Sequence, residues 1–185
     1  MSKDDIVFCI DTSAFVDLHK YYPEQRVPEL WNELSRLFQS GNVISHKIVF
    51  DELTTNSKRP SPLSKWVTAR RNNFFDMTSN QAIHVDSIIK EFPGLIDPTY
   101  EKDQADPWLI ALVLERRSQN NMFTQSQNYT VVSQENVLSS NKIPAVCKRH
   151  NIDHYDLFQF FDKNGWKLGF QKLELSTASK GIVCG

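Results

Sequence analysis

Residues Ile6–Ser13 read IVFCIDTS. The first five are apolar and carry no charge, which suits a strand buried on both faces, as in a parallel sheet with helices on either side. Asp11 would then stand at the carboxyl end of this strand, and Thr12 and Ser13 can cap a helix that follows it. This stretch therefore predicts an α/β fold whose sheet begins near the amino terminus.

The rest of the chain alternates between strand-like and helical patterns, as an α/β fold requires. Further strands are predicted over residues 42–45 and 129–133. Predicted helices cover residues 14–22, a segment from Pro28 that ends at Gly41, a segment with apolar Ile48, Val49 and Leu53, and residues 63–75, 81–92, 106–117, 144–149 and 156–162. We expect one domain over residues 1–168 and a C-terminal extension over residues 169–185 that is partly flexible.

Composition excludes several classes of protein. The 185 residues carry a formal net charge of −1, so any polyanion would have to be held by a local patch rather than by global attraction. Cys9, Cys147 and Cys184 are odd in number and lack the spacing of a zinc site, which favours a reducing cytoplasm over a disulfide framework. No apolar run is long enough to cross a membrane, so we expect no membrane partner.

Four acidic residues lie far apart in the sequence but at similar places in the predicted fold. Asp11 ends the first strand, Glu52 and Asp106 each open a helix, and Glu135 follows the strand at 129–133. A fold that gathers strand ends at one edge would bring these four side chains together.

Such a cluster of carboxylates is electrostatically unfavourable. At separations of about 5 Å and an effective dielectric of about 20, each pair repels by roughly 3 kcal/mol. Protonation or a bound divalent ion would relieve the repulsion, and an all-oxygen ligand set favours Mg²⁺ or Mn²⁺ over zinc. Because such ions promote in-line displacement at phosphorus, the cluster predicts phosphodiester hydrolysis.

The order and spacing of several short motifs resemble the PIN-like domain family, in its branch of formerly unknown function related to VapC-like toxin ribonucleases. The similarity extends over nearly all of the chain up to about Leu168. The motifs are Ile10–Ser13 (IDTS), Tyr21–Pro23 (YYP), Trp31, Asp51–Leu53 (DEL), Ala105–Ala111 (ADPWLIA), Val131–Ser133 (VVS) and Lys142–Cys147 (KIPAVC).

The resemblance implies a three-layer α/β/α sandwich with a central, mostly parallel sheet. It also implies a Mg²⁺- or Mn²⁺-dependent endoribonuclease, often the toxin of a toxin–antitoxin pair, with RNA as substrate, a cognate antitoxin as partner and a homodimer as a further assembly. Asp11, Glu52 and Asp106 match the first three acids of the family. Glu135 stands where the family usually has an Asp.

Further residues are candidates for supporting roles. Thr12, Ser13 and Ser133 are auxiliary candidates beside the acids, and Asp103 could substitute for a missing acid or cap a helix. The segment 58–75 has no acidic residue and includes Trp66, so it could line an RNA path, dock an acidic antitoxin or form a solvated helix face. Its candidate RNA-contacting residues are Lys58, Arg59, Lys65, Arg70 and Arg71.

Several aromatic and histidine residues are predicted to have structural rather than catalytic roles. Trp31, Trp108, Phe158, Phe160 and Phe161 occur at helical spacings and are predicted to pack in the core. The histidines, including His46, His150 and His154, form no ligand spacing with the cysteines and are predicted to lie on the surface or in loops.

Three competing functions remain to be weighed. A phosphatase of the haloacid-dehalogenase type needs a second Asp two residues after the first, where this chain has Ser13. Nucleotide binding on a Rossmann-like sheet needs a glycine-rich loop, and the glycines here are isolated. The third alternative is a non-catalytic PIN fold that binds RNA or a protein partner, which Glu135 and the near-neutral charge would suit.

Overall fold

The computed structural model describes residues 6–55, 60–119 and 127–166. Its centre is a five-stranded parallel sheet with the order β3-β2-β1-β4-β5. The strands are β1 (Ile6–Ile10), β2 (Val43–His46), β3 (Phe74–Phe75), β4 (Asn128–Val132) and β5 (His154–Tyr155).

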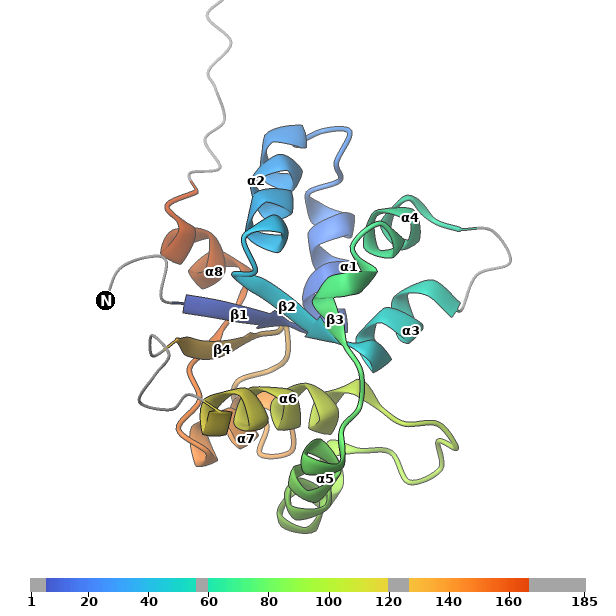
Figure 1. Ribbon diagram of the computed structural model, residues 1–185, viewed down its shortest axis with the longest axis vertical. Coiled ribbons are helices and arrows are strands. Elements are labelled where there is room, and N and C mark those ends of the chain that lie inside the picture. The colour runs from blue at the N-terminus through green and yellow to red at the C-terminus, as the bar shows by residue number, and fades with distance from the viewer. Residues whose placement is uncertain (1–5, 56–59, 120–126, 167–185) are drawn as a thin grey trace, which may run out of the picture.

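Helices cover both faces of the sheet and make it the middle layer of an α/β/α sandwich, as predicted. Figure 1 shows α1, α2, α4 and α8 on one face, and α5, α6 and α7 on the other. The helices are α1 (Thr12–Tyr21), α2 (Pro28–Gln39), α3 (Lys47–Thr55), α4 (Pro62–Thr68), α5 (Ser79–Glu91), α6 (Ala105–Gln119), α7 (Ile143–Arg149) and α8 (Leu157–Asn164), with short 3-10 turns η2 (Arg71–Asn73) and η3 (Pro93–Leu95).

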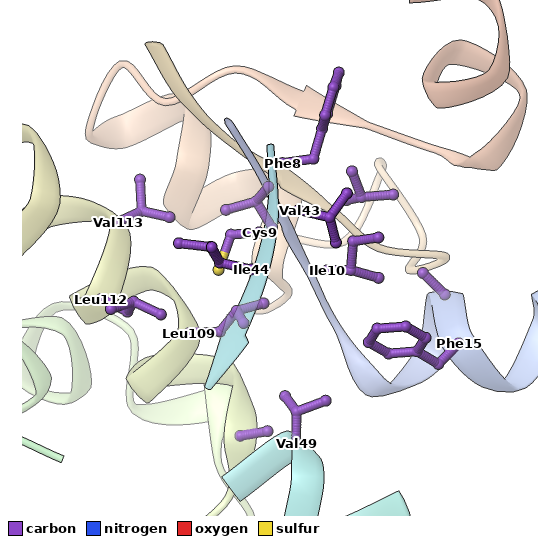
Figure 2. Packing of buried hydrophobic residues seen from close by; sticks show 14 of the residues in the cluster. Phe8, Cys9, Ile10, Phe15, Val43, Ile44, Val49, Leu109, Leu112 and Val113 are labelled. Atoms are coloured by element: carbon purple, nitrogen blue, oxygen red, sulfur yellow. The ribbon is translucent and has the colours of Figure 1, made fainter. Parts of the chain in front are cut away.

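Strand β1 is buried on both faces, which confirms the prediction from its unbroken apolar sequence. In Figure 2, Ile10 points toward Phe15 of α1, whereas Cys9 points toward Leu109 of α6. Alternate residues of one strand thus enter the two halves of the core, and β1 is flanked by β2 and β4 in the sheet. This central position sets Asp11, the next residue, in the middle of the sheet's carboxyl edge.

Helix α2 also follows its sequence pattern. Pro28 occupies the first turn, where its missing N–H costs no hydrogen bond, and Leu30, Leu34 and Phe38 form a buried stripe at intervals of four residues. Gly41 has φ +78°, a left-handed conformation that glycine adopts without strain, and it follows the last helical turn.

Segment 63–75 differs from its prediction, which was a helix throughout. Helix α4 ends at Thr68, and Phe74–Phe75 form β3, which pairs with β2. The Asn73 amide donates hydrogen bonds to the carbonyls of Phe38 and Val43 and so fixes the turn before the strand. The two-residue strands β3 and β5 were both missed because they are too short to show a periodic pattern.

The predicted surface position of His46 was wrong, and one of the aromatic predictions was also wrong. His46 is fully buried at the end of β2 and stacks on Trp108, with ring centroids 5.6 Å apart. Burial lowers the pKa of His46 to about 4, so the ring is neutral. Trp31, Trp108, Phe160 and Phe161 are buried as predicted, whereas Phe158 is 65% exposed because its side of α8 faces solvent.

A buried polar chain joins His46 to helices α5 and α6. His46 Nε2 lies 3.2 Å from Gln81 Oε1, and the Gln81 amide donates a 2.7 Å hydrogen bond to Glu115 Oε2. The Thr78 hydroxyl donates to the other Glu115 oxygen at 2.6 Å. Because His46 Nδ1 accepts the Ile48 N–H, its Nε2 is the protonated nitrogen and donates to Gln81.

Gln81→Met should destabilise the protein by about 2 kcal/mol or more, because it keeps the volume but leaves a buried Glu115 oxygen and the His46 N–H without partners. Urea unfolding would measure this loss. Ile83→Met on the same helix is the matched control, since Ile83 is 68% exposed. Equal unfolding midpoints for the two variants would contradict the network.

No helix among the described ranges is both long and apolar enough to span a membrane. Cys9 and Cys147 are buried free thiols, and burial raises the pKa of each. Cys184 and the predicted extension over residues 169–185 lie outside the described residues.

Candidate acidic site at the carboxyl edge of the sheet

A pocket of about 490 Å³ opens at the carboxyl edge of β1 and β4. All four predicted acids line it, although they come from four separate parts of the chain. The lining residues are Asp11, Thr12, Ser13, Glu52, Gly94, Leu95, Ile96, Asp97, Gln104, Ala105, Asp106, Glu135 and Lys142. The structure thus brings the acids together, and their catalytic roles remain a prediction.

Asp11 caps the start of α1 and is held by hydrogen bonds. Its Oδ2 accepts hydrogen bonds from the Ser13 backbone N–H at 3.0 Å and from the Ser13 hydroxyl at 2.6 Å. The Ser13 hydroxyl in turn accepts the Gln134 N–H at 3.0 Å, so the turn after β4 also steadies this carboxylate. The side chain is only 3% exposed, and its second oxygen, Oδ1, is buried without a hydrogen-bond partner.

This environment disfavours charge on Asp11. Burial raises the pKa of Asp11 to about 6, although the hydrogen bonds from Ser13 oppose the shift and nearby Glu135 adds to it. A buried carboxylate oxygen without a hydrogen-bond partner is costly, and a cation bound by Asp11 would remove the cost.

Glu52 links the starts of two helices. Its Oε1 accepts the backbone N–H of Ala105, the first residue of α6, at 3.3 Å, and its Oε2 accepts a short hydrogen bond from the Thr12 hydroxyl. Glu52 was predicted to open its helix, but it is the sixth residue of α3. Its neighbour Asp51 faces outward and pairs with Lys47, so Glu52 is the member of the pair that reaches the pocket.

Asp106 is the second residue of α6 and does not open that helix as its N-cap, because the helix begins at Ala105. Its pKa is raised to about 8, first by burial and then by the negative charges of Asp11 and Glu135; Lys142 opposes the shift. Near neutral pH, Asp106 therefore carries a proton when the pocket contains no cation. Asp106 shares the pocket with Asp11 and Glu135, and their negative charges add to the effect of burial.

Glu135 is anchored from the opposite side of the pocket. Its Oε2 accepts the Ile143 N–H at 2.8 Å at the start of α7, and its Oε1 forms an ion pair with Lys142 Nζ at 2.9 Å. The side chain is 13% exposed. A Glu at this position is thus long enough to reach the pocket.

The carboxylates fit a hard divalent cation in chemistry but are not yet arranged around one. Within residues 6–55, 60–119 and 127–166, no three acidic, His or Cys side chains stand in a geometry that would hold a metal ion. Glu52 and Glu135 instead each direct an oxygen toward a backbone N–H. The shared pocket, the unpaired Asp11 Oδ1 and the raised pKa values favour a cation there, because a carboxylate can rotate away from an N–H toward a cation.

The auxiliary candidates divide into two groups. Thr12 and Ser13 line the pocket and donate hydrogen bonds to its acids. Ser133 is fully buried, lies 2.8 Å from His154 Nε2 through its hydroxyl and does not line the pocket. Asp103 is exposed and also outside the pocket lining, so a replacement role for it is not supported.

The described part of the predicted RNA path lies apart from the pocket lining. Lys65 is exposed on α4, Arg70 stacks its guanidinium 3.7 Å above the Trp66 ring, and Arg71 pairs with Asp76 at 2.7 Å. Trp66 is only 8% exposed, so its ring packs in the core and is not available to stack on bases. Lys58 and Arg59 lie outside the described residues, and RNA contact by this segment stays a prediction.

Sequence reasoning missed the other side of the pocket. Residues 94–97, Gln104 and Lys142 all line it, and none was a candidate. A signal existed for Lys142, since Pro144 marks a helix start shortly after Glu135. No comparable pattern pointed to Gly94, which packs so closely on Asn141 that an added Cβ would lie 2.7 Å from its amide nitrogen.

Comparison with known proteins adds one finding. A family model described as "Domain of unknown function (DUF4411)" matches residues 8–168. No curated protein and no solved structure matches the chain.

Proposed function

The chain belongs to the DUF4411 family, whose description assigns no activity, and we propose from its acidic pocket that it is a Mg²⁺- or Mn²⁺-dependent endoribonuclease. The observation that carries the proposal is the meeting of Asp11, Glu52, Asp106 and Glu135 in one pocket, with a buried carboxylate oxygen unpaired. Oxygen ligands alone favour a hard cation.

The four side chains have distinct roles in this proposal. Asp11 and Asp106 would be the central ligands, because both are largely buried and both have a raised pKa that a cation would reverse. Glu52 and Glu135 would complete the site once an oxygen leaves its helix N–H. Thr12 and Ser13 orient the acids through their hydroxyl hydrogen bonds. The bound ion would neutralise charge that grows on the phosphate and lower the pKa of an attacking water.

The resemblance to PIN-like ribonucleases also suggests a cellular role and partners for the protein. We propose that the protein acts on RNA in the cytoplasm as the toxin of a toxin–antitoxin pair, with an antitoxin and a second copy of itself as partners. The two buried free thiols are consistent with a reducing compartment.

The cleavage reaction tests the enzymatic proposal directly. Purified protein should cut a labelled RNA only when Mg²⁺ or Mn²⁺ is present, and the downstream product should carry a 5′ phosphate. Chelation with EDTA should stop the reaction, and added metal should restore it. Cleavage that persists in EDTA, or products with a 2′,3′-cyclic phosphate, would contradict a metal-dependent mechanism.

A non-catalytic binding module is the second candidate, and a specific observation favours it. Glu52 and Glu135 each bond to the start of a helix, and Glu135 is also neutralised by Lys142, so the pocket can fold without a metal ion. For this candidate, RNA binding would occur without any heat of Mn²⁺ binding and without cleavage.

A further inference from the structure

The pocket wall contains a cation among its acids. Among its lining residues, Lys142 is the single Lys or Arg, and it faces a pocket that also holds five acidic side chains, Asp97 included. Its position is fixed by the fold, because Lys142 is the residue immediately before α7 and its carbonyl accepts the Ala145 N–H at 2.9 Å.

The contacts of Lys142 connect it to the proposed metal ligands. Its Nζ lies 2.9 Å from Glu135 Oε1. The ammonium donates to this carboxylate oxygen, and it also interacts electrostatically with Asp106 and Asp11. The same charge lowers the pKa of Asp106. Lys142 thus interacts with three of the four acids.

The ion pair between Lys142 and Glu135 contributes little to the stability of the fold. The Lys142 side chain is 46% exposed, and a pair of this exposure contributes little stability. Glu135 is already held by the Ile143 N–H at 2.8 Å, so it does not need Lys142 to stay in place. The ammonium can therefore leave Glu135 without disturbing the start of α7.

A divalent cation would change the preferred partner of Lys142. If Glu135 turned toward a cation, its charge would be shared with that cation, and the ammonium beside it would be repelled and left without an anion. The phosphodiester of a nucleic acid supplies an anionic oxygen of the kind that Lys binds.

We propose that Lys142 is a substrate-binding residue of this pocket, which releases Glu135 and contacts a non-bridging oxygen of the RNA phosphate. This inference rests on the proposed function and names the side chain that would hold the substrate. In the free protein Lys142 partly neutralises the acids, and in the complex it neutralises the phosphate. The acidic pocket can then accept an anion despite the chain's net charge of −1.

Binding of a short single-stranded RNA, measured by fluorescence anisotropy in Ca²⁺ and in EDTA over a range of salt concentrations, tests this role. Lys142→Gln should weaken binding about tenfold, as expected for the loss of one charge-assisted hydrogen bond. It should also reduce the slope of log K against log salt by about 0.7, the value for one phosphate contact on a single strand. Lys142→Arg should restore both quantities. The matched control is Lys90→Gln, because Lys90 pairs with Asp86 on the exposed face of α5.

Calorimetric titration with Mn²⁺ alone separates this role from a structural one. Lys142→Gln should bind Mn²⁺ as tightly as the wild type or more tightly, because a competing positive charge is gone. Wild-type RNA affinity and salt slope in Lys142→Gln would overturn the inference. So would a joint loss of RNA binding and Mn²⁺ binding that Lys142→Arg does not rescue, since that result would indicate a folding role.

The two proposals can fail separately. If the wild type neither binds Mn²⁺ nor cleaves RNA, the nuclease proposal fails, but dependence of RNA binding on Lys142 in EDTA would still support the phosphate contact. If the wild type cleaves RNA and Lys142→Gln binds and cleaves it equally well at every salt concentration, the nuclease proposal stands and the role of Lys142 is wrong. Absence of RNA binding by the wild type would overturn both.

Discussion

Asp11→Asn and Asp106→Asn should each lower the rate of RNA cleavage about a thousandfold or more, because losing a metal ligand removes several kcal/mol of transition-state stabilisation. Both side chains line the pocket, and Asn keeps their size while removing the negative charge. The rate of single-turnover cleavage at saturating Mn²⁺ is the appropriate measurement.

Asp51→Asn is the matched control for these variants. Asp51 lies next to Glu52 in the sequence but faces outward and pairs with Lys47. We expect Asp51→Asn to cleave RNA at the wild-type rate and Glu52→Gln to be strongly impaired. Full activity in Asp11→Asn or Asp106→Asn, with circular dichroism like that of the wild type, would place the chemistry elsewhere.

The stability of the metal-free protein should fall as pH rises from about 4 to about 8, and Asp106 should cause much of the fall. Its pKa is about 8 in the folded chain, against about 3.9 for an unfolded Asp. Between these values the folded chain keeps a proton that the unfolded chain has lost, so the free energy of unfolding decreases with pH. The contribution is present below the unfolded pKa and is lost as pH rises through the folded pKa.

Asp106→Asn removes this dependence. In EDTA at pH 8.5, the variant should be more stable than the wild type by on the order of 3 kcal/mol, somewhat less than the full shift implies because water still reaches the pocket. At pH 4 the two proteins should differ little. Urea unfolding at both pH values measures the difference, with Asp86→Asn on exposed α5 as control. Equal stability of the wild type and Asp106→Asn in EDTA at pH 8.5 would contradict the raised pKa of Asp106.

Much of the fold could be predicted because its central elements have strong local patterns. The unbroken apolar run of β1 and the stripe of α2, with apolar residues at intervals of four, both show in the sequence which residues are buried. By contrast, the two-residue strands β3 and β5 are defined by their pairing with β2 and β4, which is a tertiary contact that local sequence does not show. His46 was misplaced for a similar reason: its neutral ring is stabilised in the core by Gln81, which lies 35 residues away.

In the candidate site, too, local patterns could be predicted and tertiary contacts could not. The position of Asp11 at a strand end and of Asp106 near a helix start could be predicted from neighbouring residues. The orientation of Glu52 could not, because it depends on the N–H of Ala105 in a distant helix. Lys142 was overlooked, although Pro144 marks a helix start just after it, because its contact with Glu135 depends on the fold.

Calorimetric titration of the metal-free protein with Mn²⁺ at pH 7, in two buffers of different ionisation enthalpy, tests most directly whether the four carboxylates form one cation site. With pKa values of about 8 for Asp106 and about 6 for Asp11, ion binding must displace a proton that is mainly on Asp106. We expect one class of binding site and the release of about one proton per ion, with both signals lost in Asp11→Asn. No binding at millimolar Mn²⁺ would contradict a shared metal site at Asp11, Glu52, Asp106 and Glu135. Binding that releases no proton and that persists in Asp11→Asn would contradict it as well.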